Sequence, residues 1–74
     1  MIIKEVSPHE GFVLHAVAEN GVSGKFDVSP YLESEAFEPL KSPDEFKKIH
    51  NGKYYIEWEC GADLSADTIE AHLK

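Results

Sequence analysis

YYIEWECGADLSADTI, residues 54–69, combines a strand, a tight turn and the start of a helix. The aromatic and β-branched residues at its beginning favour a strand, and Gly61 favours a turn. Ser65 is a good helix N-cap, and Asp67 places negative charge in the first turn of the helix that follows. A strand that leads through a turn into a capped helix indicates a small domain of mixed α and β structure.

Three strands and a hairpin are predicted in the first part of the chain. Residues 1–6 favour a first strand that ends at Ser7-Pro8, because proline cannot donate a hydrogen bond to a neighbouring strand. Residues 11–18 are apolar on both faces, which is typical of a strand inside a sheet. Asn20-Gly21 predicts a type I′ turn, and residues 22–28 form the returning strand.

A short helix is expected from Ser42 onward. Ser42 can cap it, Pro43 suits its first position, and Glu45 can complete a capping box. Asn51-Gly52 would end this helix. A shorter helical turn is expected after Ser29-Pro30.

Residues 53–58 predict a fourth strand, with Tyr54, Ile56 and Trp58 facing the core and Tyr55 facing outward. Together the elements predict one α+β domain over residues 1–74. We expect a small antiparallel sheet of three to five strands with two or three short helices packed on it.

The length of 74 residues leaves room for one hydrophobic core of limited size. Because Cys60 is the single cysteine, a disulfide framework cannot supplement that core, so a homodimer interface or a protein partner is the more plausible supplement. The sequence contains no apolar run long enough for a membrane span and no signal peptide. We therefore expect a cytoplasmic protein that does not contact a membrane.

The charge balance argues against direct binding to nucleic acid. Fourteen acidic residues face seven lysines, which gives a net charge of −7, and the sequence has no arginine. Affinity for nucleic acid comes largely from cationic contacts to phosphate. An acidic surface would suit a basic partner, although acidity in a small protein commonly serves solubility alone.

The sequence offers no catalytic, cofactor or metal-ligand pattern. His9, His15, His50 and His72 are too far apart for the usual spacing of zinc ligands, and no ligand of that spacing lies near Cys60. The glycines form no phosphate-binding loop. We expect neither an enzyme nor a bound cofactor.

Four residues are the candidates for binding a partner. Glu33, Glu35 and Glu38 form an acidic segment interrupted by apolar residues, and Tyr55 is the aromatic side chain expected at the surface. Exposed strand edges could also accept a strand from a partner.

The order of several motifs resembles domain-of-unknown-function family 2442. The motifs run over nearly the whole chain: Asn20-Gly21, Phe26-Asp27-Val28-Ser29-Pro30, Phe37-Glu38-Pro39-Leu40, Phe46, Ile56-Glu57-Trp58, Gly61, Asp63-Leu64-Ser65 and Thr68-Ile69. The chain departs from the family at Glu59-Cys60, where a Pro-Asn type of turn is common.

This resemblance implies a bacterial protein with a small α+β domain, similar to the N-terminal part of some longer helix-turn-helix proteins. We expect no such extension here, because the sequence ends at Lys74 after one short helix. Members of the family are often encoded beside a small protein of uncharacterised family 4160, an arrangement similar to a toxin–antitoxin pair. No catalytic residues are established for the family.

The leading hypothesis is a non-enzymatic protein-interaction module, the antitoxin-like or accessory half of a two-protein system. The alternative is a regulatory domain that acts on transcription through a DNA-binding partner or a dimer. Neither the partner nor the oligomeric state follows from the sequence.

Overall fold

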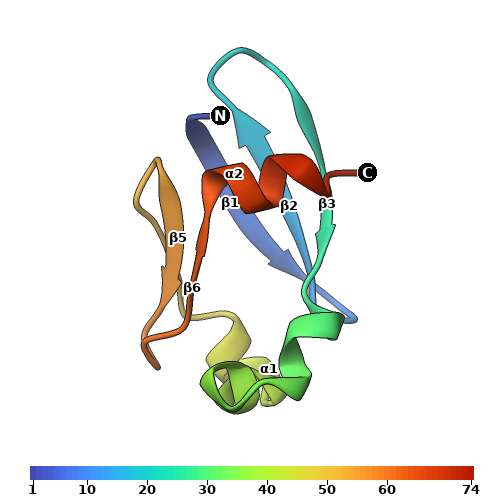
Figure 1. Cartoon of the computed structure of the whole chain (residues 1–74), viewed down its shortest axis with the longest axis vertical. Coiled ribbons are helices and arrows are strands. Elements are labelled where there is room, and N and C mark those ends of the chain that lie inside the picture. The colour runs from blue at the N-terminus through green and yellow to red at the C-terminus, as the bar shows by residue number, and fades with distance from the viewer.

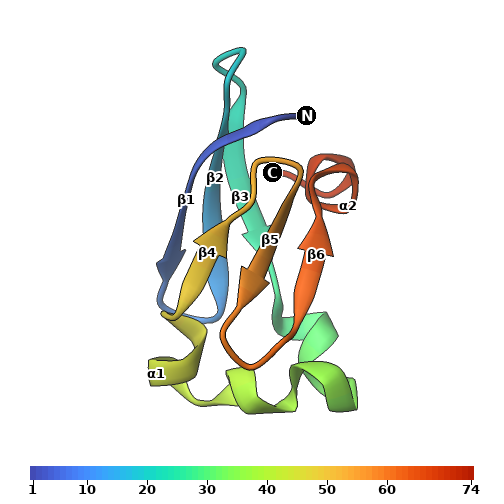
Figure 2. The ribbon, with the colours of Figure 1, turned by 90° about the vertical axis from the view of Figure 1, so that its left-hand side faces the viewer.

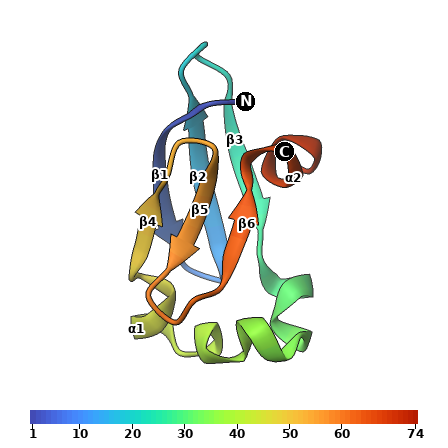
Figure 3. The ribbon, with the colours of Figure 1, turned by 60° about the vertical axis from the view of Figure 1, so that its left-hand side comes forward.

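Six strands in the computed structural model, which describes residues 1–74, form two antiparallel sheets. The first sheet contains β1 (Ile3–His9), β2 (Val13–Ala18) and β3 (Ser23–Asp27) in the order β1-β2-β3. The second contains β4 (Ile49–Asn51), β5 (Tyr55–Trp58) and β6 (Asp63–Ser65) in the order β4-β5-β6. The two sheets lie one in front of the other (Figure 3). The predicted α+β class is confirmed, with the strands divided between two sheets.

The sheets meet where β1 lies beside β4. The backbone N–H of Ile3 donates to the carbonyl of Lys53 at 2.8 Å, and the side-chain amide of Asn51 donates to the carbonyl of Ile3 at 2.9 Å. On the opposite side the sheets are open, and α2 (Ala66–Ala71) runs from the end of β6 across to β3 (Figure 1). The strands β3 and β6 are therefore the outer edges of the two sheets.

One end of the molecule is closed by the connection between the sheets (Figure 2). This connection contains two 3₁₀ helices, η1 (Ser29–Glu33) and η2 (Glu35–Lys41), and the short α1 (Pro43–Phe46). The proline inside η2 is compatible with a short 3₁₀ segment and prevents a long helix. No helix in the chain is both long enough and apolar enough to cross a membrane.

The core lies between the two sheets and is entirely apolar. Trp58 is its largest side chain: its indole N–H donates to the carbonyl of Phe46 at 2.9 Å, and the two rings stack with centroids 5.9 Å apart. The indole therefore buries its ring without leaving its polar group unpaired. The core residues come from both sheets, the closing end and α2: Ile3, Leu14, Ala16, Phe26, Val28, Leu32, Phe37, Leu40, Phe46, Ile56, Trp58, Ala62, Leu64, Ala66 and Ile69.

The first strand continues past the predicted stop at Ser7-Pro8 and ends at His9. In the ladder between β1 and β2, Ser7 pairs with His15 and His9 pairs with Val13. Because hydrogen-bonded residues alternate along a strand, Pro8 occupies a position whose N–H would point away from β2. Proline is tolerated there because β1 loses no ladder hydrogen bond.

The hairpin at Asn20-Gly21 is confirmed, but the predicted type I′ turn is wrong. Only Gly21 has a positive φ, 90°. The N–H of Gly21 donates to the carbonyl of Ala18 at 3.0 Å, and the N–H of Ala18 donates to the carbonyl of Val22 at 2.7 Å. The loop thus has three residues, a turn followed by a left-handed glycine, which is the next most common hairpin connection.

The predicted helix after Ser42 is much shorter than expected. It ends at Phe46, and Ser42 makes no capping hydrogen bond from its side chain. Ile49–Asn51 then forms β4, in which Ile49 pairs with Trp58. Pairing with a strand that is anchored in the core overrides the weak local preference for helix.

Residues 54–69 contain the predicted strand and capped helix, but Asp63–Ser65, predicted as part of the turn that leads into the helix, forms β6. Ile56 and Trp58 are buried and Tyr55 is exposed, but Tyr54 is 67% exposed because it lies outside the strand, in the turn before β5. The N-cap of α2 is confirmed, since the N–H of Thr68 donates to the Ser65 hydroxyl at 3.2 Å.

Candidate interaction surface

The three candidate glutamates lie together on the 3₁₀ segment that closes one end of the molecule. Glu33 is the last residue of η1, Glu35 is the first residue of η2, and Glu38 follows one turn later. All three side chains are exposed, and none forms an ion pair. They point outward because the large apolar residues of the same segment are buried: Leu32 before the three glutamates, Phe37 among them and Leu40 after them. The segment therefore presents free carboxylates on a fixed backbone.

Tyr55 lies at the other end of the fold. It is the first residue of β5, it is 47% exposed, and it pairs with Ser65, the residue that caps α2. In Figure 2 α2 and the start of β5 lie far from the 3₁₀ segment. The structure thus brings the three glutamates together but does not add Tyr55 to them.

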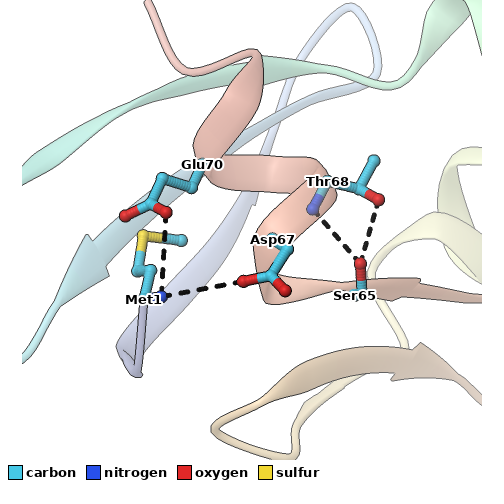
Figure 4. A network of polar contacts seen from close by, with 5 residues as sticks. All are labelled: Met1, Ser65, Asp67, Thr68 and Glu70. Atoms are coloured by element: carbon cyan, nitrogen blue, oxygen red, sulfur yellow. Dashed lines mark hydrogen bonds and ion pairs between the residues drawn. The ribbon is translucent and has the colours of Figure 1, made fainter.

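The helix α2 is fixed across the open side by contacts at its N-terminal end (Figure 4). The Ser65 hydroxyl accepts from the N–H of Thr68 and lies 2.9 Å from the Thr68 hydroxyl oxygen. The N-terminal ammonium group of Met1 lies 3.9 Å from Asp67 and 3.8 Å from Glu70. The contacts join the first residue of the chain to its last helix.

The histidines and the cysteine do not converge on a chemical site. His9 and His15 lie in an edge-to-face arrangement with ring centroids 6.1 Å apart, and His50 lies 3.7 Å from Glu59. Cys60 is exposed. No group of three or more histidine, cysteine, aspartate or glutamate side chains has a geometry that could hold a metal ion.

A groove of about 550 Å³ lies between the β1–β2 turn and α1, and the sequence did not predict it. Its apolar walls include Phe12 and Phe46, whose rings are edge to face at 5.4 Å. Phe12 has a φ of 60°, which is unusual for a bulky residue. The residues belong to segments more than thirty positions apart, and the one local signal is an aromatic residue directly after Gly11.

Two charged groups have shifted pKa values, and both shifts have local causes. The pKa of Asp27 lies below its ordinary value of 3.8, because the backbone N–H and the side chain of Ser29 hydrogen-bond its carboxylate. Desolvation opposes this lowering of the pKa, and the attraction of Lys74 is the smallest contribution. The pKa of Lys48 is raised by its hydrogen bond to Glu45 at 3.2 Å. Neither group belongs to a cluster of catalytic character.

Comparison with protein families gives a match over nearly the whole chain. The matching family model is described as a protein of unknown function (DUF2442) and covers residues 3–74. The chain belongs to the DUF2442 family. The description of DUF2442 assigns no activity, ligand or partner to its members. Comparison with curated proteins and with solved structures found no match.

Proposed function

We propose that this DUF2442 protein is a non-enzymatic protein-interaction module, the antitoxin-like or accessory half of a two-protein bacterial system. The main support is the set of exposed and unpaired carboxylates of Glu33, Glu35 and Glu38. Because their backbone is already fixed, these carboxylates can bind a basic surface without the entropy cost of ordering a mobile loop.

The overall charge supports the same proposal. At a net charge of −7 the protein attracts a basic partner at long range, and this attraction raises the association rate. Such binding weakens as salt is added, because the Debye length falls from about 10 Å at 0.1 M to about 3 Å at 1 M.

Affinity purification from the native host tests the proposal. The tagged wild-type protein is expected to recover a stoichiometric, basic partner at low salt. The triple variant Glu33→Lys, Glu35→Lys and Glu38→Lys is expected to recover at least tenfold less of it. A matched control carries Glu5→Lys, Glu19→Lys and Glu57→Lys, which change the net charge by the same amount at exposed positions elsewhere.

The control separates local recognition from total charge. Equal loss in both triple variants would show that only the net charge matters, and recovery of the wild-type protein alone at low salt would overturn the proposal.

Tyr55 stays a predicted second contact, and the same assay with Tyr55→Ala tests it on its own.

A further inference from the structure

The outer edge of β3 is partly occupied by a residue of the same chain. The N–H of Lys25 donates to the carbonyl of Lys74 at 2.9 Å, and the N–H of Lys74 donates to the carbonyl of Lys25 at 2.9 Å. Two residues that exchange both hydrogen bonds form an antiparallel pair. Lys74 thus occupies the place of one residue of a fourth strand.

The remainder of this edge is free. Bonds from Ala18 to Val22 and from Val28 to Phe12 show that β3 uses its even-numbered residues to bond β2. Its odd-numbered residues therefore direct their backbone groups outward. Ser23 and Asp27 are these residues on either side of Lys25, and neither has a backbone partner at the outer edge.

Lys74 is a poor occupant of the edge for two reasons. The chain turns away directly before it, since the N–H of His72 still bonds the carbonyl of Ile69 at the end of α2. Lys74 also lies opposite Lys25, and like charges in directly opposed residues are destabilising, although the charge of Lys74 weakly attracts the Asp27 carboxylate. A segment that paired with all three outward residues would form more hydrogen bonds without this repulsion.

A cavity of about 250 Å³ lies at the free Asp27 end of the edge. The ring of Phe26 stacks on that of Tyr31 at 5.7 Å to form an apolar wall. His72 and Lys74 line the cavity from the side of α2. The cavity lies beside the residue that follows Lys25, so a strand added to β3 would direct one side chain toward it.

We propose that the β3 edge is a strand-acceptor site for an extended segment of a protein partner, which replaces Lys74 and runs antiparallel to β3. The chemistry of the edge sets the order of side chains in that segment. A cationic residue lies opposite Asp27, the next residue is apolar and faces the cavity, and the third is acidic and lies opposite Lys25. This proposal rests on the proposed function, because it locates a contact of the same partner.

Two peptides of identical composition test the charge order. One is acetyl-Thr-Lys-Val-Glu-Thr-Thr-amide, whose last threonine lies opposite Ser23, and the other, acetyl-Thr-Glu-Val-Lys-Thr-Thr-amide, has the two charges exchanged. In an NMR titration of the full chain, the first peptide is expected to shift the amide signals of Ser23, Lys25, Asp27 and Lys74 and to bind at least fivefold more tightly than the second.

Two variants sharpen the test. Asp27→Asn keeps an oxygen that can accept from the N–H of Ser29 but removes the charge, and Lys25→Glu reverses the opposing charge. Each is expected to reduce the preference for the first peptide at least twofold. Equal affinity for both peptides, or shifts confined to other surfaces, would overturn the proposal. So would concentration-dependent shifts of these amides without peptide, since a second copy would then occupy the edge.

Affinity purification distinguishes this proposal from the proposed function. Lys25→Pro removes the outward N–H at the centre of the edge and no bond to β2. If the wild-type protein recovers a partner and Lys25→Pro recovers at least fivefold less, the edge contacts that partner. Full recovery by a folded Lys25→Pro variant would overturn the edge proposal and leave the interaction module intact.

Discussion

The two sheets of this protein enclose the same core but differ in the length of their strands. The strands of the first sheet contain seven, six and five residues and follow one another through two hairpins. Those of the second contain three, four and three residues. Strands as short as the second set form few hydrogen bonds, so they depend on what their side chains bury.

This difference in strand length indicates that different interactions determine the pairing in each sheet. Alternation and a hairpin turn determine the pairing of β2 with β3 within a short stretch of chain. The second sheet is held by Ile56, Trp58 and Leu64, which are buried against side chains of the first sheet and the closing end. The first sheet is specified mainly by local sequence, and the second by tertiary packing.

Removal of the Trp58 side chain is the strongest test of this comparison. We expect Trp58→Ala to reduce the free energy of unfolding by about 3–5 kcal/mol, because it leaves a cavity and an unpaired carbonyl at Phe46. A domain of this length has only about 4–11 kcal/mol in total, at about 0.05–0.15 kcal/mol per residue. Urea denaturation followed by circular dichroism measures the loss.

Val17→Ala is the comparison at a partly buried position of the first sheet. Val17 lies on the outer face of β2 and is only partly buried, so we expect a loss below about 1 kcal/mol. Equal losses in the two variants would show that the loss at Trp58 does not depend on the burial of its side chain.

The next largest effect concerns the helix that follows the second sheet. We expect Ser65→Ala to cost about 1 kcal/mol, because it removes the oxygen that accepts from the N–H of Thr68. Ser42→Ala is a control, since Ser42 precedes α1 without a capping bond, and it should change stability by no more than about 0.5 kcal/mol. Similar thermal shifts for both serines would contradict the difference between the two helix starts.

The same contrast explains how much of the fold could be predicted. The strand predicted at 53–58, the hairpin at Asn20-Gly21 and the cap at Ser65 have strong local signals. The structure contains the hairpin and the cap, and it contains the strand over Tyr55–Trp58. The strand Ile49–Asn51 has no strong local signal, because three residues are too few to show the alternation of apolar and polar side chains, and the strand is stabilised by its pairing with β5. The predicted end of β1 at Ser7-Pro8 was wrong, because a proline interrupts a strand only where its missing N–H would face the paired strand.

In the candidate interaction surface, too, some features follow from local sequence and others depend on the tertiary structure. The sequence shows Glu33, Glu35 and Glu38 as one acidic segment interrupted by apolar residues, and burial of the neighbouring Leu32, Phe37 and Leu40 leaves the three carboxylates exposed. The position of Tyr55 at the opposite end of the molecule does not follow from local pattern. The sequence predicted exposed strand edges in general but not that β3 provides one, because the availability of this edge depends on Lys74, which is far away in sequence and adjacent in space.

A smaller and more local effect is expected at Gly24 in the first sheet. A Cβ at this position would lie 3.0 Å from the carbonyl oxygen of Lys74, so Gly24→Ala should shift the end of the chain by a few tenths of an ångström. We expect the free energy of unfolding to change by no more than about 0.5 kcal/mol, while the amide of Lys74 becomes less protected from hydrogen exchange. Retained protection would show that the bridge to β3 tolerates the methyl group.

The smallest effect is expected at Asp27, where the first sheet ends, and it depends on pH. Because the pKa of Asp27 is lower in the folded protein than its ordinary value of 3.8, its carboxylate stabilises the fold above that value, and this stabilisation is lost as the pH falls through the folded pKa. Asp27→Asn should therefore be slightly less stable than the wild type at pH 7, and the difference should vanish as the solution becomes strongly acidic. Most of the difference should persist in 1 M salt, because the hydrogen bonds from Ser29 lower the pKa more than the attraction of Lys74 does. Thermal unfolding of both proteins between pH 2 and pH 7 measures it, and a difference that grew toward acid would mean that the carboxylate destabilises the end of the sheet.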